Sequence, residues 1–172
     1  MRKYPIIFIC MFFASLSVFA FGSKEATQRS DHRFTDKSLS RILDGRRDTK
    51  IIAKALHSTG VDRQIEKLDG YTVFIPTDDA VRKMTDRLQA AMLTNPDVLL
   101  QVLTDVMVKG VMSAEELEQK GSVTTMGKIK LSIRKKGRSI TVSDSDAAAT
   151  DLFGNGFVVH VVSGITVLDI KM

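Results

Sequence analysis

The stretch Thr72–Val81 constrains the fold more than any other part of the chain. Its first four residues are β-branched or aromatic, as in a buried strand. Pro76 cannot donate to a sheet, so we expect the strand to end there. Thr77 is a preferred helix N-cap, and Asp78 and Asp79 place negative charge at the positive end of a helix dipole. Apolar residues then follow at helical spacing, at Val81, Met84 and Leu88. The stretch therefore predicts a strand, a sharp corner and a helix.

The N-terminus predicts a secretory signal peptide over residues 1–22. Arg2 and Lys3 precede a 16-residue apolar run, and small residues follow it. We expect cleavage after Ala20 or after Gly22. Because the run is shorter than the ~20 residues that span a bilayer comfortably, an uncleaved anchor is the second interpretation. The protein is therefore expected to be secreted or periplasmic.

Removal of this segment would change the chemistry that the chain can support. It takes away the only cysteine, Cys10, so the mature chain can form neither a disulfide nor a thiolate site. The formal net charge falls from +5 to +3 when Arg2 and Lys3 leave, which is a small basic excess for a nucleic-acid-binding protein. About 150 residues remain, enough for one domain with a sizeable core. We expect a polar linker over residues 23–35 and a single domain over residues 36–172.

Local signals predict helices on both sides of the Thr72–Val81 stretch. Apolar spacing from Asp48 predicts a helix that Gly60 ends, and a second short helix follows. Asn95-Pro96 is a good helix start, and Ser113–Glu116 matches a capping box. The chain therefore alternates helices with strands.

Residues 121–142 predict a β-hairpin with a basic surface. Apolar and polar residues alternate over residues 128–134, which is typical of a strand with one solvated face. Residues 135–138 supply the turn into a returning strand. Six cations within eleven residues are the candidate partner-binding residues: Lys128, Lys130, Arg134, Lys135, Lys136 and Arg138. We expect those on the strand to share one face and those at the turn to project beyond it.

This basic hairpin has two interpretations. It could attract anionic lipid head groups, an acidic polysaccharide or an acidic protein. It could also be an edge strand that its lysines keep soluble and unpaired. Charge on exposed edges is ordinary, which favours the second interpretation.

A near-continuous apolar run predicts a second buried strand, over residues 157–162, with Asn155-Gly156 as the turn before it. His160 lies in this strand. No cysteine, serine-nucleophile motif or second histidine at ligand spacing accompanies it in the sequence. We therefore interpret His160 as a core imidazole with both nitrogens hydrogen-bonded.

The carboxylates give no stronger case for chemistry. Asp78 and Asp79 are adjacent at a helix start, so they point in different directions and cannot flank a substrate as an acid–base pair. Asp144, Asp146 and Asp151 loosely resemble a calcium-binding loop. The glycine and the closing glutamate that such a loop requires are missing. We expect a protein that is not an enzyme and that uses no metal or cofactor.

Two separated boxes resemble the signatures of fasciclin-like domains. The first signature is usually close to T-V-F-A-P-T-D-x-A-F, and the second is commonly N-G-x-x-H-x-I-D. The matching residues in this chain are Thr72, Phe74, Pro76, Thr77, Asp78, Asn155, Gly156 and His160. In the second box Phe157 makes the interval to the histidine one residue longer, and Ser163 stands near the usual aspartate.

The segment Leu103–Gly110 resembles the middle of the same family, commonly L-x-Y-H-V-V-x-G. The Tyr-His pair of that pattern is linked to cell adhesion in animal relatives. Asp105-Val106 stands in its place here. The fold can tolerate this exchange, but adhesion through that pair is not expected of this chain.

The resemblance covers roughly residues 36–170. It implies an α+β fold, a small β-sandwich or wedge with several helices packed around it. It also implies a non-catalytic adhesion or interaction role at the cell envelope or in the extracellular matrix. The implied partner is a cell-surface or matrix component such as an acidic polymer or a lipid surface, and no nucleic acid.

A rival class is a periplasmic small-ligand binding protein with a pocket between helices and sheet. The oligomeric state is left open by the sequence. The short chain, the lack of disulfides in its mature part and the absence of an N-glycosylation acceptor favour a bacterial source.

Overall fold

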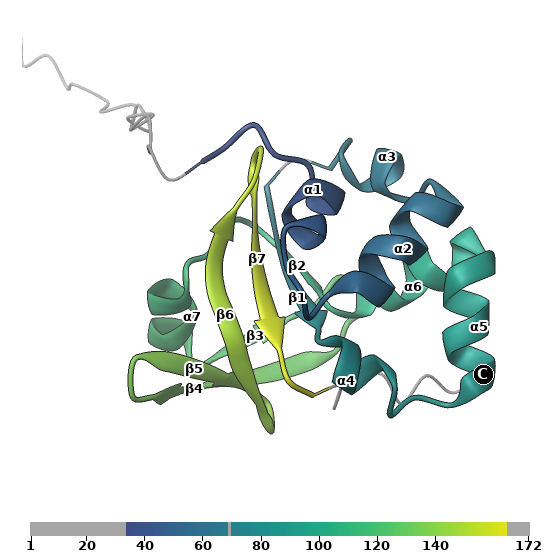
Figure 1. The fold of residues 1–172 in the computed structure, drawn as a ribbon. Helices are drawn as coiled ribbons and strands as arrows, with labels where there is room; N and C mark the ends of the chain where they lie inside the picture. The colour runs from purple at the N-terminus through teal and green to yellow at the C-terminus, as the bar shows by residue number, and fades with distance from the viewer. Residues whose placement is uncertain (1–33, 69, 165–172) are drawn as a thin grey trace, which may run out of the picture. The chain divides into compact units, whose positions relative to one another are not determined.

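Two strands that are far apart in the sequence lie side by side near one edge of a seven-stranded sheet. The computed structural model describes residues 34–68 and 70–164, and these residues form the sheet in the order β2-β1-β7-β6-β5-β4-β3. β1 and β7 run parallel, and the other neighbouring strands run antiparallel. The strands in Figure 1 are β1 (Tyr71–Pro76), β2 (Met107–Lys109), β3 (Ser122–Thr124), β4 (Lys130–Lys136), β5 (Ser139–Val142), β6 (Ser145–Phe153) and β7 (Phe157–Val162).

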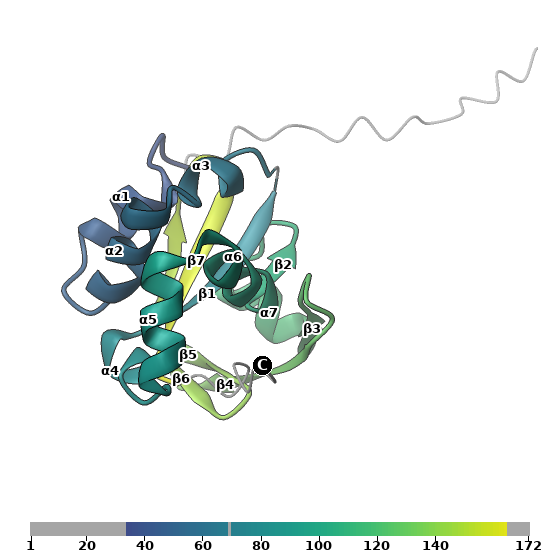
Figure 2. The same ribbon diagram turned by 90° about the vertical axis from the view of Figure 1, so that its right-hand side faces the viewer.

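The β1–β7 pair lies between a group of helices and the part of the domain that contains α7. The helices of the described residues are α1 (Leu39–Asp44), α2 (Lys50–Thr59), α3 (Asp62–Ile65), α4 (Asp78–Val81), α5 (Asp86–Thr94), α6 (Pro96–Asp105) and α7 (Ala114–Lys120). Figures 1 and 2 show α2, α5 and α6 packed together on one side of the pair, whereas α7 lies on the other side, against β3, β4 and β5. Every residue of β1 and β7 is consequently buried, which confirms the two buried strands predicted from their apolar sequences.

The connection between β3 and β4 folds back toward the opposite edge of the sheet. The N–H of Met126 donates to the carbonyl of Met107 in β2 (2.7 Å), and the N–H of Gly127 donates to the carbonyl of Thr104 in α6 (3.0 Å). These two bonds tie the region beside β3 to β2, so the sheet is a nearly closed wedge. The mixed α+β class expected from the sequence is confirmed.

Several helices begin and end where local signals predict. Gly60 ends α2 with φ +69°, a left-handed conformation that glycine adopts without a steric penalty. The side chain of Asn95 caps α6, and Ser113 and Glu116 form the predicted capping box of α7. Thr77 caps α4 by accepting the N–H of Ala80 (3.3 Å).

The single helix expected after Thr77 is instead two helices. α4 ends at Val81, and α5 begins after Thr85, whose hydroxyl accepts the N–H of Leu88 (3.4 Å). The apolar spacing across Val81, Met84 and Leu88 continues through this break. The periodicity was therefore misleading, because Thr85-Asp86 is a second N-cap signal inside it.

The basic hairpin is not at an edge of the sheet. β4 pairs with β3 on one side and with β5 on the other, so the edge-strand interpretation is wrong. β3 is the edge, and its three residues were not predicted as a strand. β6 was not predicted either, because its run of alanines has low β-propensity and its pairing with β7 is irregular.

The expected signal peptide over residues 1–22 and nearly all of the expected linker over residues 23–35 lie outside the described residues. These boundaries stay predictions, as does the extent of the domain. Within the described ranges, no helix has the length and apolar character needed to cross a membrane. The described residues all belong to one compact unit.

Candidate functional site

The two boxes that suggested the family are adjacent in the structure. In the parallel pairing of β1 with β7, Phe74 lies opposite His160 and Pro76 lies opposite Val162. The rings of Phe74 and His160 stack with centroids 5.6 Å apart. Residues that are more than eighty positions apart in the sequence therefore form one buried contact.

Thr72 and His160 together fix the segment that leads from β2 to α7. The hydroxyl of Thr72 donates to the carbonyl of Gly110 (2.7 Å) and accepts the N–H of Met112 (2.9 Å). Nε2 of His160 lies 3.0 Å from the carbonyl of Met112, so it must carry the proton and donate. Both side chains are fully buried. The two boxes thus satisfy backbone groups that would otherwise be unpaired in the core.

His160 is neutral in this environment. Its Nδ1 accepts the N–H of Asp151 (3.4 Å), so both ring nitrogens have backbone partners, as expected from the sequence. Burial lowers the pKa of His160, opposed by the hydrogen bond to Met112 and by the charge of Asp151. A buried imidazole with both nitrogens engaged has no atom available for a substrate or a metal.

Asp78 has a structural role in a helix other than the one it begins. Its carboxylate accepts the N–H groups of Lys50 (3.1 Å) and Ile51 (2.8 Å), the first residues of α2. Thr49 stands at the N-cap position of α2 but makes no side-chain capping bond. Asp79 instead faces solvent and pairs with Arg82 (2.8 Å). The two aspartates are therefore not an acid–base pair.

Asn155 and Gly156 form the turn before β7. Gly156 has φ +75°, and the N–H of Asn155 donates to the carbonyl of Lys37 (3.2 Å). At the preceding Gly154, a Cβ atom would lie 2.1 Å from the ring of Phe157, so only glycine fits. The second box therefore anchors the segment before α1 to the start of β7.

The three aspartates of the loose calcium pattern do not form a site. Asp146 pairs with Lys136 (2.6 Å), and Asp151 accepts the N–H of Ala114 at the start of α7 (2.8 Å). Asp151 adopts φ +58°, which aims its carboxylate at that helix end. Over the described part of the chain, no group of three metal-ligating side chains is close enough to hold an ion.

The six candidate partner-binding cations occupy four different places. Alternation along β4 puts Lys130, Arg134 and Lys136 on its solvated face, opposite Leu131 and Ile133, which are buried. Across the sheet their partners are polar, namely Thr124, Thr141 and Ser139. We call Lys130, Arg134 and Lys136 the outer row.

The remaining three cations are not part of the outer row. Lys135 points to the other side of the hairpin, where its Nζ pairs with Glu118 of α7 (3.2 Å). Lys128 lies in the connection before β4, and Arg138 lies in the β4–β5 turn. Residues 135–138 were predicted to form the turn, but β4 extends to Lys136, so Lys135 lies within the strand and does not project beyond it.

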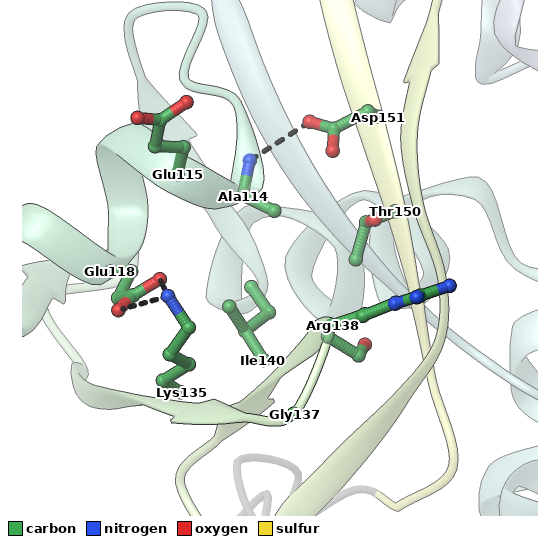
Figure 3. Close-up of a pocket in the computed structure, with 10 residues that line it drawn as sticks. Ala114, Glu115, Glu118, Lys135, Gly137, Arg138, Ile140, Thr150 and Asp151 are labelled. Carbon is green, nitrogen blue, oxygen red and sulfur yellow. Dashed lines mark hydrogen bonds and ion pairs between the residues drawn. The ribbon is translucent and has the colours of Figure 1, made fainter.

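A pocket of about 500 Å³ lies between α7, the β4–β5 turn and β6. Figure 3 shows Glu118 and Lys135 paired on one wall, with Asp151 bound to the backbone of Ala114 on another. Glu115 and Arg138 complete a lining of mixed charge. In this pocket Glu118 pairs with Lys135 and Asp151 binds a backbone N–H. Its lining residues therefore do not form an aligned nucleophile, base and oxyanion donor.

Asp105 and Val106 lie in the interior of the domain, within the segment Leu103–Gly110 that resembles the middle of the family pattern. Asp105 and Val106 are 8% and 4% exposed. Nε2 of Gln101 donates to the Asp105 carboxylate (2.9 Å). Burial raises the pKa of Asp105, opposed by this hydrogen bond. The pair therefore presents little surface to a partner.

Comparison with known proteins agrees with this geometry. The family model of the Fasciclin domain matches residues 47–167. The FAS1 domain pair of the insect cell adhesion molecule Fasciclin I is a similar solved structure, with a TM-score of 0.52 and 17% sequence identity. The match covers 67% of this chain and 44% of that chain, so this chain spans less than half of the domain pair. No curated protein sequence matches. The family model covers most of the chain, and this protein therefore belongs to the fasciclin domain family.

Proposed function

We propose that this protein is an exported, non-catalytic interaction module that contacts an acidic surface at the cell envelope or in the extracellular matrix. Fasciclin domains are typically adhesion or interaction modules, typically extracellular or secreted, and generally non-catalytic. Four polar side chains of the two signature boxes are bonded to backbone groups, so the proposed contact surface lies elsewhere; they are Thr72, Thr77, Asp78 and His160.

The single observation behind the proposal is the exposed, partly unpaired charge of the outer row. Lys130 and Arg134 are exposed on one face of β4 and have no ion-pair partner among the described residues. Lys136 shares that face but pairs with Asp146. The three cations are exposed, so no helix of the described residues covers them. A row of cations on a rigid strand suits a repeating acidic polymer or an anionic lipid surface.

Charge reversal tests the proposal. We expect the variant Lys130→Glu with Arg134→Glu to lose binding to anionic liposomes or to a sulfated polysaccharide. Each cation near an anionic membrane contributes about 1 kcal/mol, so loss of the two positive charges alone should weaken binding roughly thirtyfold, and the two added negative charges should weaken it further. Wild-type binding should also weaken as salt is added.

The matched control reverses two exposed cations on the helical side of the domain, Lys54→Glu in α2 with Arg87→Glu in α5. It changes the net charge equally but leaves the outer row intact, so binding should fall much less. Equal losses in both variants would mean that net charge alone attracts the protein. That result would refute the outer row as the contact surface.

Export is tested on the protein itself. If residues 1–22 are a cleaved signal peptide, the intact mass of protein recovered from outside the cytoplasm should correspond to a chain that begins at Phe21 or Ser23. A full-length mass in a membrane fraction would instead support the uncleaved anchor. Recovery of the full-length chain from the cytoplasm would contradict export.

A further inference from the structure

The face of the sheet that carries the outer row is polar across three strands. Strand pairing puts four hydroxyl side chains of β3 and β5 on the same side as the outer row, and β4 adds a fifth. They are Ser122, Thr124, Ser139 and Thr141, with Ser132 on β4. The apolar residues of these three strands are buried on the opposite side, against which α7 packs. Every outward residue of β3, β4 and β5 therefore carries a hydroxyl or a positive charge.

Three of these hydroxyls lie around Lys130 and Arg134. Ser132 stands between the two cations on β4, Thr124 lies opposite Lys130, and Ser122 lies opposite Ser132. Within the described part of the chain, none of the three hydroxyls has a hydrogen-bond partner. Each can donate one hydrogen bond and accept two, so each is available to a partner outside the domain.

The polar groups at the other end of the face are already engaged. On β5 the hydroxyls of Ser139 and Thr141 donate to backbone carbonyls (3.3 and 3.4 Å). Lys136, which lies opposite Ser139, pairs with Asp146 (2.6 Å). The available charges and hydroxyls are therefore concentrated over β3 and the first part of β4.

This chemistry suits a polysaccharide better than a lipid surface. Stable attachment to a membrane requires a cluster of about 4–8 cations, or apolar side chains that enter the lipid as well as charge. This face has two cations without an ion-pair partner among the described residues, Lys130 and Arg134, and it has no apolar side chain. Free hydroxyls beside cations instead match a partner that carries both hydroxyl and acidic groups.

We propose that a linear acidic polysaccharide binds over β3 and β4. Its sulfate or carboxylate groups accept charge-assisted hydrogen bonds from Lys130 and Arg134. These two residues are about 13 Å apart along β4, from the rise of an extended strand. Sugar hydroxyls between the acidic groups exchange hydrogen bonds with Ser122, Thr124 and Ser132. This inference rests on the proposed function and deepens it, because it names the class of polymer that the outer row contacts.

Removal of hydroxyls at constant charge tests the inference. The probe is a heparin oligosaccharide, and vesicles containing phosphatidylserine are the lipid comparison. We expect Thr124→Val with Ser132→Ala to bind the oligosaccharide roughly tenfold more weakly than wild type, because two hydrogen bonds are lost. Both positions lie on the solvated face and valine is favoured in strands, so thermal unfolding should show that the domain remains folded.

The matched control is Ser139→Ala with Thr141→Val on β5. It removes the same two residue types from the same face, but their hydroxyls already bind backbone carbonyls. The control should bind the oligosaccharide as wild type does. In the wild type, the oligosaccharide should shift the backbone NMR signals of β3 and β4 most. Equal losses in the two variants, or shifts confined to other elements, would overturn the assignment to β3 and β4.

The two probes separate this inference from the proposed function. Unchanged oligosaccharide affinity in Thr124→Val with Ser132→Ala would overturn polysaccharide recognition, as would tighter binding to the vesicles than to the oligosaccharide. If Lys130→Glu with Arg134→Glu still abolished binding in that case, the outer row would remain the contact surface for an acidic partner. Absence of binding to both probes would overturn both proposals.

Discussion

His160 is a buried titratable group whose protonation should govern stability near neutral pH. Its pKa is lowered by burial, so the unfolded state binds a proton at higher pH than the folded state does. At pH well above about 6.5 both states are neutral and His160 has no pH effect. As the pH falls below about 6.5, the unfolded state gains the proton and the folded domain loses stability, with a limiting slope of about 1.4 kcal/mol per pH unit.

Denaturant unfolding of wild type and His160→Gln between about pH 7 and about pH 5 measures this effect. The wild type should lose stability over that interval more steeply than the variant. The variant should be less stable at neutral pH, because glutamine cannot reach both Met112 and Asp151 as the imidazole does. Parallel pH profiles for the two proteins would show that His160 does not titrate in this range.

At the same scale, the sequence predicted which residues are structural better than it predicted their contacts. It identified His160 as a core imidazole and Asp78 as a capping residue. It could not show that Asp78 caps α2, because that helix begins twenty-eight positions earlier in the chain. Nor could it show that Thr72 and His160 hold the same segment. Such contacts depend on how distant elements pack, which no local pattern records.

At the scale of the helices and strands, α2 depends on a capping residue from outside the helix, Asp78. Asp78→Ala would leave the N–H groups of Lys50 and Ile51 without their acceptor, at a cost of about 1–3 kcal/mol. Asp79→Ala is the neighbouring control, since its side chain is 88% exposed, and it should change stability little. Thermal unfolding compares the two variants. Hydrogen exchange at Lys50 and Ile51 should accelerate only in Asp78→Ala.

Elements with strong end signals could be predicted from the sequence, and those without them could not. The caps at Thr77, Asn95 and Ser113 each combine a side-chain acceptor with a suitable first turn. The Thr85 cap was missed because apolar spacing continued across it. β6 was missed because three consecutive alanines lie in it and because its strand character comes from pairing with β5 and β7. The candidate contact surface was found as charge in the sequence, but the extent of β4 and the Lys135–Glu118 pair show that Lys135 lies inside the strand and faces α7.

At the scale of the whole domain, two apolar strands and their flanking motifs predicted the α+β fold class. They did not predict that the sheet is nearly closed. Closure depends on the approach of the β3–β4 connection to α6 and β2. Gly127 lies at this approach, where a Cβ atom would be 2.0 Å from Oδ1 of Asp105 and 3.0 Å from its Cα. The sequence shows a glycine at position 127, but only the structure shows the close approach to Asp105 that requires it.

Gly127→Ala should therefore destabilise the domain by about 1–3 kcal/mol, because either α6 or the β3–β4 connection must move. Gly45→Ala is the matched control, since its Cβ would come no closer than 3.4 Å to another atom, and it should have little effect. Denaturant unfolding measures both. Asp105→Ala removes the nearest clashing atom, so the double variant with Gly127→Ala should lose less stability than the sum of the single losses. Strict additivity would mean that this contact does not hold the sheet closed.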